Sequence, residues 1–292
     1  MLVNLKMGKN FTTAFNKMCE KYGEDFELLN GLHETQMNYG DFIDNFTKDN
    51  KNVADNTIDA NANVSSKDIQ SLLKEKGKSH DKLLAFNKIF YEMQKKYGIK
   101  TAREWLDLEF GPYLYLHDAP TSTYLHYCYA YDLSRLAKEG LFFIENYNNE
   151  PPQHLQTFLD DVIEYVSYMS NRSSGAVGIP DIIIWMFYFW KKDVENNYYL
   201  KSPEYYLKQA FQKLIFRLNQ KFYRDQTQTV FSNMSIFDRI YLEELFGGRE
   251  YPDGTFVIDY IEEIMNAQKM FMEVVSETRK IQLFTYPVNL AA

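Results

Sequence analysis

Residues 151–192 read PPQHLQTFLDDVIEYVSYMSNRSSGAVGIPDIIIWMFYFWKK, and they contain the clearest structural pattern of the sequence. After the two prolines, apolar residues recur at three- and four-residue steps, which predicts an amphipathic helix that begins where a missing N–H costs least. The stripe consists of Leu155, Phe158, Leu159, Val162, Ile163, Val166 and Met169. The polar segment 170–181 breaks this helix. Residues 182–192 are apolar nearly all round, which predicts a second helix that is either buried or part of an interface.

Further helices are predicted on both sides of this stretch. Towards the C-terminus, Ser202 and Pro203 begin one helix, and residues 259–278 form another. Towards the N-terminus, helices are predicted at residues 11–22, in a short segment after Ser66, at residues 83–97 and at residues 124–140. Gly98 is predicted to end the helix at 83–97.

Strands are predicted singly between the helices, at residues 111–120 (GPYLYLHDAP), 226–237 (QTQTVFSNMSIF) and 281–292 (IQLFTYPVNLAA). Residues 49–68 have no hydrophobic period, so we expect an ordered loop or extended segment there. Because helices dominate and strands alternate with them, the sequence predicts a helix-rich α/β fold with a mainly parallel sheet.

The composition excludes several classes of protein. The 292 residues carry a net charge of −8, so the chain lacks the basic surface of a general nucleic-acid binder, and we expect no nucleic-acid partner. Two cysteines, Cys19 and Cys128, are too few for a disulfide framework or a four-ligand zinc site, and we predict no metal site. The N-terminus has no signal-peptide pattern, and the longest apolar run is too short to span a bilayer. We therefore expect a cytoplasmic protein that does not associate with membranes.

Polar residues inside apolar segments are the first candidates for a site. His117 and Asp118 directly follow the sequence YLYL, where they could line a site at a strand end or simply form a turn. Cys128 lies among aromatic residues, which is typical of a small core residue and also compatible with a redox thiol.

Three further segments could bind an anion or a sugar. Arg172 belongs to SNRSSGAVG, whose backbone N–H groups could bind a phosphate or form a plain turn, and Lys191-Lys192 add positive charge to an acidic chain. Ser232 and Asn233 are polar residues around one predicted strand, where they could bind a substrate or satisfy the loop backbone.

Seven segments match one known family in order and spacing over residues 44–290. They are IDANANV (58–64), YLHDAP (115–120), YCYAYDL (127–133), residues 151–181, FRLNQ (216–220), QTQTVFSNMSIFDRIYLEELFGGREYPDG (226–254) and TYPVNL (285–290). Together these segments resemble the anaerobic, class III ribonucleotide reductases, which are glycyl radical enzymes. Any one of them would be a weak signal, whereas the ordered set is specific.

The resemblance implies a ten-stranded α/β barrel built from two five-stranded halves, of which this chain would hold the first. Residues 46–292 would then be the N-terminal half of the barrel domain, and residues 1–45 an N-terminal extension without an ATP-cone. The finger-loop cysteine, the radical glycine and the zinc-binding cysteines of the family are expected beyond this sequence. A complementary C-terminal half would have to supply them.

The resemblance also implies a reaction. The family reduces ribonucleoside triphosphates to deoxyribonucleoside triphosphates, in many members with formate as the reductant. An iron–sulfur activase that uses S-adenosylmethionine generates the glycyl radical, and we expect no cofactor to be bound by this half itself. Cys128 matches the family's barrel cysteine, which would help the 2′ hydroxyl to leave as water and whose presence indicates the formate-using type.

The remaining candidates take their roles from the same resemblance. His117, Asp118, Ser232 and Asn233 are predicted to bind the substrate. Members of the family are dimers with a nucleotide effector site at the subunit interface. Arg172, Lys191 and Lys192 are therefore predicted to bind a dNTP or ATP effector in a homodimer.

We accordingly predict the N-terminal portion of an anaerobic ribonucleoside-triphosphate reductase that is inactive as an isolated chain. Two alternatives stay open at this point. One is a catalytically inactive nucleotide-binding or regulatory remnant of the same fold. The other is a glycyl radical enzyme of the pyruvate formate-lyase type, which YLHDAP and SNRSSGAVGIPD fit less well.

Overall fold

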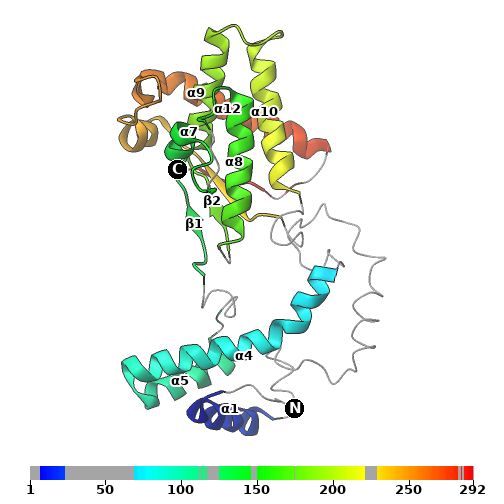
Figure 1. Cartoon of the computed structure of the whole chain (residues 1–292), viewed down its shortest axis with the longest axis vertical. Coiled ribbons are helices and arrows are strands. Elements are labelled where there is room, and N and C mark those ends of the chain that lie inside the picture. The colour runs from blue at the N-terminus through cyan, green and yellow to red at the C-terminus, as the bar shows by residue number, and fades with distance from the viewer. Residues whose placement is uncertain are drawn as a thin grey trace. The chain divides into compact units, whose positions relative to one another are not determined.

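The computed structural model describes residues 7–23, 69–111, 113–114, 116, 125–145, 150–173, 175–220, 229–281, 284 and 286–291. These residues form two compact units, one with the helices that precede His126 and one with the chain from Tyr127 onward (Figure 1). The predicted domain boundary at residues 45–46 and the predicted loop at 49–68 lie outside the described residues. No helix in the described part combines the length and apolarity that a membrane crossing requires.

The first unit consists of three helices around an aromatic core. They are α1 (Lys9–Tyr22), α4 (Ile69–Tyr97) and α5 (Ile99–Phe110). Phe86 and Phe110 meet edge to face at 5.0 Å between ring centroids, and Phe11 packs in the same way on Phe90 at 5.7 Å. The predicted helix at 11–22 is confirmed, and Cys19 on it packs against this core.

Helix α4 is continuous, so the prediction of two separate helices between Ser66 and Tyr97 is wrong for the part from Ile69 onward. A single internal glycine, Gly77, weakens a helix by only about 1 kcal/mol relative to alanine, which does not stop a helix of this length. The predicted end is confirmed, since Gly98 follows α4 with a φ of +88° and donates its N–H to the carbonyl of Gln94.

The described residues of the segment 111–120, which are 111, 113, 114 and 116, do not form the strand that was predicted there. They turn back on α5, where the N–H of Leu114 donates to the carbonyl of Leu108 at 3.0 Å. The N–H of Leu116 donates to Oε1 of Glu109 at 2.8 Å. These backbone groups are thus bonded to the preceding helix rather than to a neighbouring strand. Helix α5 itself was not predicted.

The second unit is organised by a parallel sheet of four strands in the order β1-β2-β3-β4. The strands are β1 (Tyr129–Ala130), β2 (Val177–Gly178), β3 (Ser232–Ile236) and β4 (Val288–Ala291). All three neighbouring pairs are parallel, which confirms the predicted helix-rich α/β class. The strands predicted at 226–237 and at the C-terminal end of the chain are confirmed as β3 and β4.

The helix predicted over residues 124–140 is wrong in its first part. Tyr129 donates its N–H to the carbonyl of Ala176, and Tyr131 donates to that of Gly178, so this segment joins the edge of the sheet as β1. Only its end is helical, as the short α7 (Ser134–Glu139). Pairing with β2, which local spacing does not reveal, decides the conformation of these residues.

Helices pack around this sheet and enclose the main core. They are α8 (Leu155–Ser170), α9 (Ile182–Glu195), α10 (Pro203–Leu218) and α12 (Ile261–Ile281), with the short α11 (Arg239–Tyr241), the π-helical turn η3 (Leu242–Phe246) and the 3₁₀ turn η4 (Val257–Tyr260). Residues 182–189 of α9 are all buried, which decides between the two interpretations of that segment in favour of a buried helix. The predicted helices at 151–169, 202–218 and 259–278 are confirmed.

Candidate functional site

Cys128 lies immediately before β1 with its side chain exposed and its thiol free of any disulfide. The backbone N–H of Ala176, which precedes β2, points at its Sγ at 3.2 Å. The thiol is therefore accessible to a ligand and fixed by the neighbouring strand, rather than buried as a small core residue would be.

Two glycines make room for the polar groups at this end of the sheet. A Cβ built on Gly175 would lie 2.9 Å from Sγ of Cys128 and 2.6 Å from the carbonyl oxygen of Tyr127. A Cβ on Gly178 would lie 2.6 Å from Oδ1 of Asn233. Any larger residue at either position would collide with these atoms. The two glycines of SSGAVG therefore let Cys128 and Asn233 approach the backbone of this segment closely. This role of the two glycines was not foreseen from the sequence.

Asn233 and Ser232 point to opposite faces of the sheet, because side chains alternate along a strand. Asn233 is half-buried and pairs in register with Gly178, which in turn pairs with Ala130. Two strand spacings put Asn233 about 10 Å from Ala130 across the sheet. Ser232 is 1% exposed, and among the described residues its Oγ has no hydrogen-bond partner. His117 and Asp118 lie outside the described residues, and their roles stay predictions.

The three predicted effector residues are not brought together within the chain. Arg172 follows the C-terminal end of α8, where its guanidinium lies 3.5 Å from the ring centroid of Tyr168. Lys192 instead donates to Oε1 of Gln153, just before the N-terminal end of α8. A helix of 16 residues is about 24 Å long, so these two cations lie at opposite ends of it. Lys191 is paired with Glu195 and lies 4.6 Å from the ring centroid of Tyr260.

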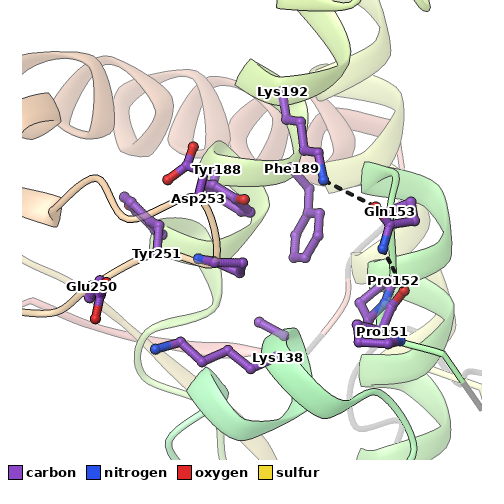
Figure 2. A pocket seen from close by; sticks show the side chains of 12 residues that line it. Lys138, Pro151, Pro152, Gln153, Tyr188, Phe189, Lys192, Glu250, Tyr251 and Asp253 are labelled. Carbon is purple, nitrogen blue, oxygen red and sulfur yellow. Dashed lines mark hydrogen bonds between the residues drawn. The ribbon is translucent and has the colours of Figure 1, made fainter.

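A cavity of about 480 Å³ opens beside Lys192 (Figure 2). One wall is formed by Pro151, Pro152 and Gln153, and another by Tyr188, Phe189 and Lys192 of α9. Lys138, next to the end of α7, lies across the cavity from Lys192, and the loop 250–253 closes the remaining side. Of this lining, only Lys192 was identified from the sequence, because the other residues come from separate segments.

Two aromatic rings of the cavity lining stack on each other. The rings of Tyr188 and Tyr251 stack at 4.7 Å with an angle of 13° between their planes. Burial, together with the carboxylate of Asp253, raises the pKa of Tyr188 to about 12, so its hydroxyl stays neutral and can act as a hydrogen-bond donor. Asp253 accepts hydrogen bonds from the N–H and the hydroxyl of Thr255. These two bonds satisfy part of the hydrogen-bonding capacity of its carboxylate within the loop. The cavity lining thus carries two lysines, Lys138 and Lys192, and two carboxylates, Glu250 and Asp253.

A separate ion network lies at the carboxyl ends of the strands. Arg249 bonds to Asp132, which follows β1, and to Asp181, which follows β2. Burial of Asp181 and the nearby charge of Asp132 raise the pKa of Asp181 to about 6. In the part of the chain that the structure describes, no cluster of three or more histidine, cysteine or acidic side chains could hold a metal ion.

Comparisons with known proteins identify the family to which this chain belongs. A model of the anaerobic ribonucleoside-triphosphate reductase family matches residues 77–292. The crystal structure of the anaerobic ribonucleotide reductase from Thermotoga maritima with dATP bound in the specificity site is 33% identical, with a TM-score of 0.83. The structure of that enzyme in complex with dATP and CTP is also 33% identical, with a TM-score of 0.84. Each comparison covers 100% of this chain and 46% of the solved chain.

A further solved structure, described as an anaerobic ribonucleotide reductase, is 34% identical with a TM-score of 0.83, and the match covers 99% of this chain and 45% of that one. No curated protein matches the sequence. The matches define a family of oxidoreductases, the ribonucleotide reductases. The chain belongs to the anaerobic ribonucleoside-triphosphate reductase family, which confirms the resemblance and decides against the pyruvate formate-lyase alternative. It spans about half the length of the solved structures that it matches.

Proposed function

We propose that this chain supplies the N-terminal part of an anaerobic ribonucleoside-triphosphate reductase, with Cys128 as its reactive thiol. The observation that carries the proposal is the exposed, disulfide-free Sγ of Cys128, which is fixed by the N–H of Ala176 and made accessible by the absence of a side chain on Gly175. A cysteine that served only to fill the core would be buried.

The substrate would lie along the face of the sheet that carries Asn233. The amide of Asn233 can both donate and accept, which suits a ribose hydroxyl or a phosphate oxygen. The spacing of about 10 Å from β1 to β3 is of the size of a nucleoside. Ser232 would have to act from the opposite, buried face, whereas His117 and Asp118 would complete the site from the segment before β1.

The radical chemistry would come from a complementary C-terminal half. When that half is present, its glycyl radical supplies the one-electron chemistry and formate supplies the reducing equivalents. This chain's contribution is to bind the nucleotide, orient its ribose against Cys128 and exclude water. The iron–sulfur activase and a homodimeric, cytoplasmic assembly belong to the same proposal.

The cavity beside Lys192 is proposed to bind a dNTP or ATP effector. Lys138 and Lys192 can pair with a triphosphate, and the lining also carries the carboxylates of Glu250 and Asp253. The dATP in the specificity site of the Thermotoga maritima enzyme makes this ligand class the natural one to test. Arg172 and Lys191 do not line the cavity, so their proposed part in effector binding needs a contribution from a second subunit.

Reconstitution tests the catalytic proposal. The chain alone should form no glycyl radical and reduce no nucleotide. Combined anaerobically with a complementary half, activase and formate, it should turn over, and Cys128→Ser should lower turnover by orders of magnitude. Cys19→Ser is the matched control and should stay within a few-fold of the parent. Turnover by Cys128→Ser at the parent rate would refute the assignment of Cys128.

Nucleotide binding without any turnover in the reconstituted system would instead favour the second candidate, a regulatory remnant. The observation that keeps this candidate open is that the Lys192 cavity is formed entirely by this chain and does not involve Cys128.

A further inference from the structure

Asp193 occupies a position in α9 that its own helix disfavours. It lies in the last turn, where the helix dipole is negative and a carboxylate is repelled. It is also 2% exposed, and burial of an unpaired carboxylate is costly. A charge in such a place requires partners from other elements.

Those partners come from the start of α8 and from the turn after α9. Oδ1 of Asp193 lies 2.6 Å from Nδ1 of His154, and Oδ2 accepts from the N–H of Leu155 and the hydroxyl of Tyr199, both at 3.0 Å. His154 precedes α8 and gives that helix no side-chain cap. Asp193 therefore caps α8 from a different helix, where its charge faces the favourable end of the dipole.

The residues next to this junction form two walls of the Lys192 cavity. Gln153 precedes His154 in the chain and Lys192 precedes Asp193, and the two side chains bond to each other at 3.2 Å. Gln153 also donates to the carbonyl of Pro151 at 3.1 Å, which links the bond to the proline wall. Whatever holds α8 against α9 at this point also sets where the ammonium group of Lys192 lies.

We propose that Asp193 is a positioning residue for the Lys192 cavity: it fastens the N-terminal end of α8 to the C-terminal end of α9 and so fixes Lys192 relative to the wall 151–153. Which ligand the cavity takes rests on the proposed function above. The fastening itself does not depend on it.

Amide hydrogen exchange of the full 292-residue chain tests the fastening directly. Asp193→Asn keeps the size of the side chain and removes its charge, and it should speed exchange of the amides in 154–158, including that of Leu155. Tyr199→Phe removes one bond only, and it should act in the same direction with a smaller effect. Asp160→Asn, at an exposed carboxylate on α8 that pairs with Lys213, is the matched control and should leave these amides unchanged.

Calorimetric titration with dATP adds a readout that a purely structural role would not move. Asp193→Asn should weaken dATP binding about tenfold, the loss expected for one misplaced charged hydrogen bond. Because the effect acts through Lys192, the double variant with Lys192→Gln should bind no more weakly than Lys192→Gln alone.

The outcomes separate the two proposals. If the parent chain is folded and binds no dATP, the effector proposal is refuted. The exchange data then still test whether Asp193 holds α8 against α9. The positioning role would be refuted if Asp193→Asn left the exchange of amides 154–158 unchanged. If Asp193→Asn does not fold, unchanged exchange in Tyr199→Phe would refute it. Additive losses in the double variant would likewise overturn it.

Discussion

Arg249 donates from Nη1 to Oδ2 of Asp181 at 2.7 Å, and this bond ties the loop after η3 to the carboxyl end of β2. The same carboxylate accepts from the indole N–H of Trp185 at 2.9 Å and from the backbone N–H of Leu133. Asp181 is 1% exposed and Arg249 is its cationic partner. The carboxylate of Asp181 is therefore buried where the segment after β1, the start of α9 and the loop after η3 meet.

Replacing Arg249 by methionine should lower the free energy of unfolding by about 3 kcal/mol, because it leaves a buried carboxylate without its cation. Chemical denaturation at pH 7 measures this change. Arg239→Met is the control, since Arg239 forms exposed pairs with Glu243 and Glu262, and it should cost less than about 1 kcal/mol. Equal losses in the two variants would contradict the importance of the buried pair.

Stability should fall as the pH rises from about 4 to about 6. Burial raises the pKa of Asp161 to about 6, and nearby Asp160 and Glu164 add to the shift. Asp181 is raised to a similar value by burial and by Asp132. A carboxyl group with a raised pKa binds its proton more tightly in the folded state, so its stabilisation is present at low pH and is lost as the pH passes the folded pKa.

Asp161→Asn should flatten this dependence and raise the free energy of unfolding at pH 7 by about 1 kcal/mol, because it removes a poorly solvated charge. Denaturation curves at pH 4, 5, 6 and 7 measure both effects. Glu263→Gln, on the exposed side of α12, should leave the slope unchanged. An Asp161→Asn variant with the parent slope would show that Asp161 does not titrate in this range.

Gly175→Ala should disturb the thiol of Cys128. The new Cβ would lie 2.6 Å from the carbonyl oxygen of Tyr127, and a backbone atom cannot move aside as a flexible side chain can. We expect a loss of about 1–3 kcal/mol in stability together with a changed rate of alkylation at Cys128. Mass spectrometry after brief iodoacetamide treatment gives that rate, with Cys19 as an internal reference.

The control for this substitution is Gly248→Ala, because nothing lies within 4 Å of a Cβ at Gly248. It should leave both stability and alkylation near the parent values. If Gly175→Ala behaved in the same way, the close approach of Cys128 to the backbone would not matter for its reactivity.

Lys192→Gln should weaken dATP binding about tenfold, the effect of one lost charged hydrogen bond. Isothermal titration calorimetry at moderate ionic strength measures it. Lys208→Gln removes an equal charge from an exposed pair with Glu273, away from the cavity lining, and should not change the affinity. Equal losses in both variants would indicate that net charge, rather than the cavity, governs binding.

Long periodic segments could be predicted from the sequence because burial of one helix face needs a local pattern. The stripe from Leu155 to Val166 and the Ser202-Pro203 start are examples, and both helices form where they were predicted. Strands β1 and β2 have two residues each, which is too short for any period to be visible. Their conformation follows from hydrogen bonds to partners about 48 residues away in the chain, and local spacing contains no such information.

The candidate site shows the same division. The prediction that Cys128 is a reactive thiol came from the family resemblance, and it stays a prediction. The choice of Asn233 as a polar strand residue and of Lys192 as a local cation came from residue types. That Gly175 and Gly178 hold polar groups against bare backbone could not be predicted, because it depends on distances between separate strands. Nor could the separation of Arg172 from Lys192 by the length of α8, since the two are only 20 positions apart in the sequence.

By itself, the sequence determined the helix-rich parallel α/β class and the family, because periodicity and ordered motifs are properties of the chain alone. Only the tertiary structure decided which face of the sheet Asn233 and Ser232 occupy, which lysine lines a cavity, and that Asp193 caps a helix other than its own. Each of these depends on packing between elements. A buried charge is tolerated only when the fold supplies its hydrogen-bond or ionic partner, and a glycine is required only where another group packs against its backbone.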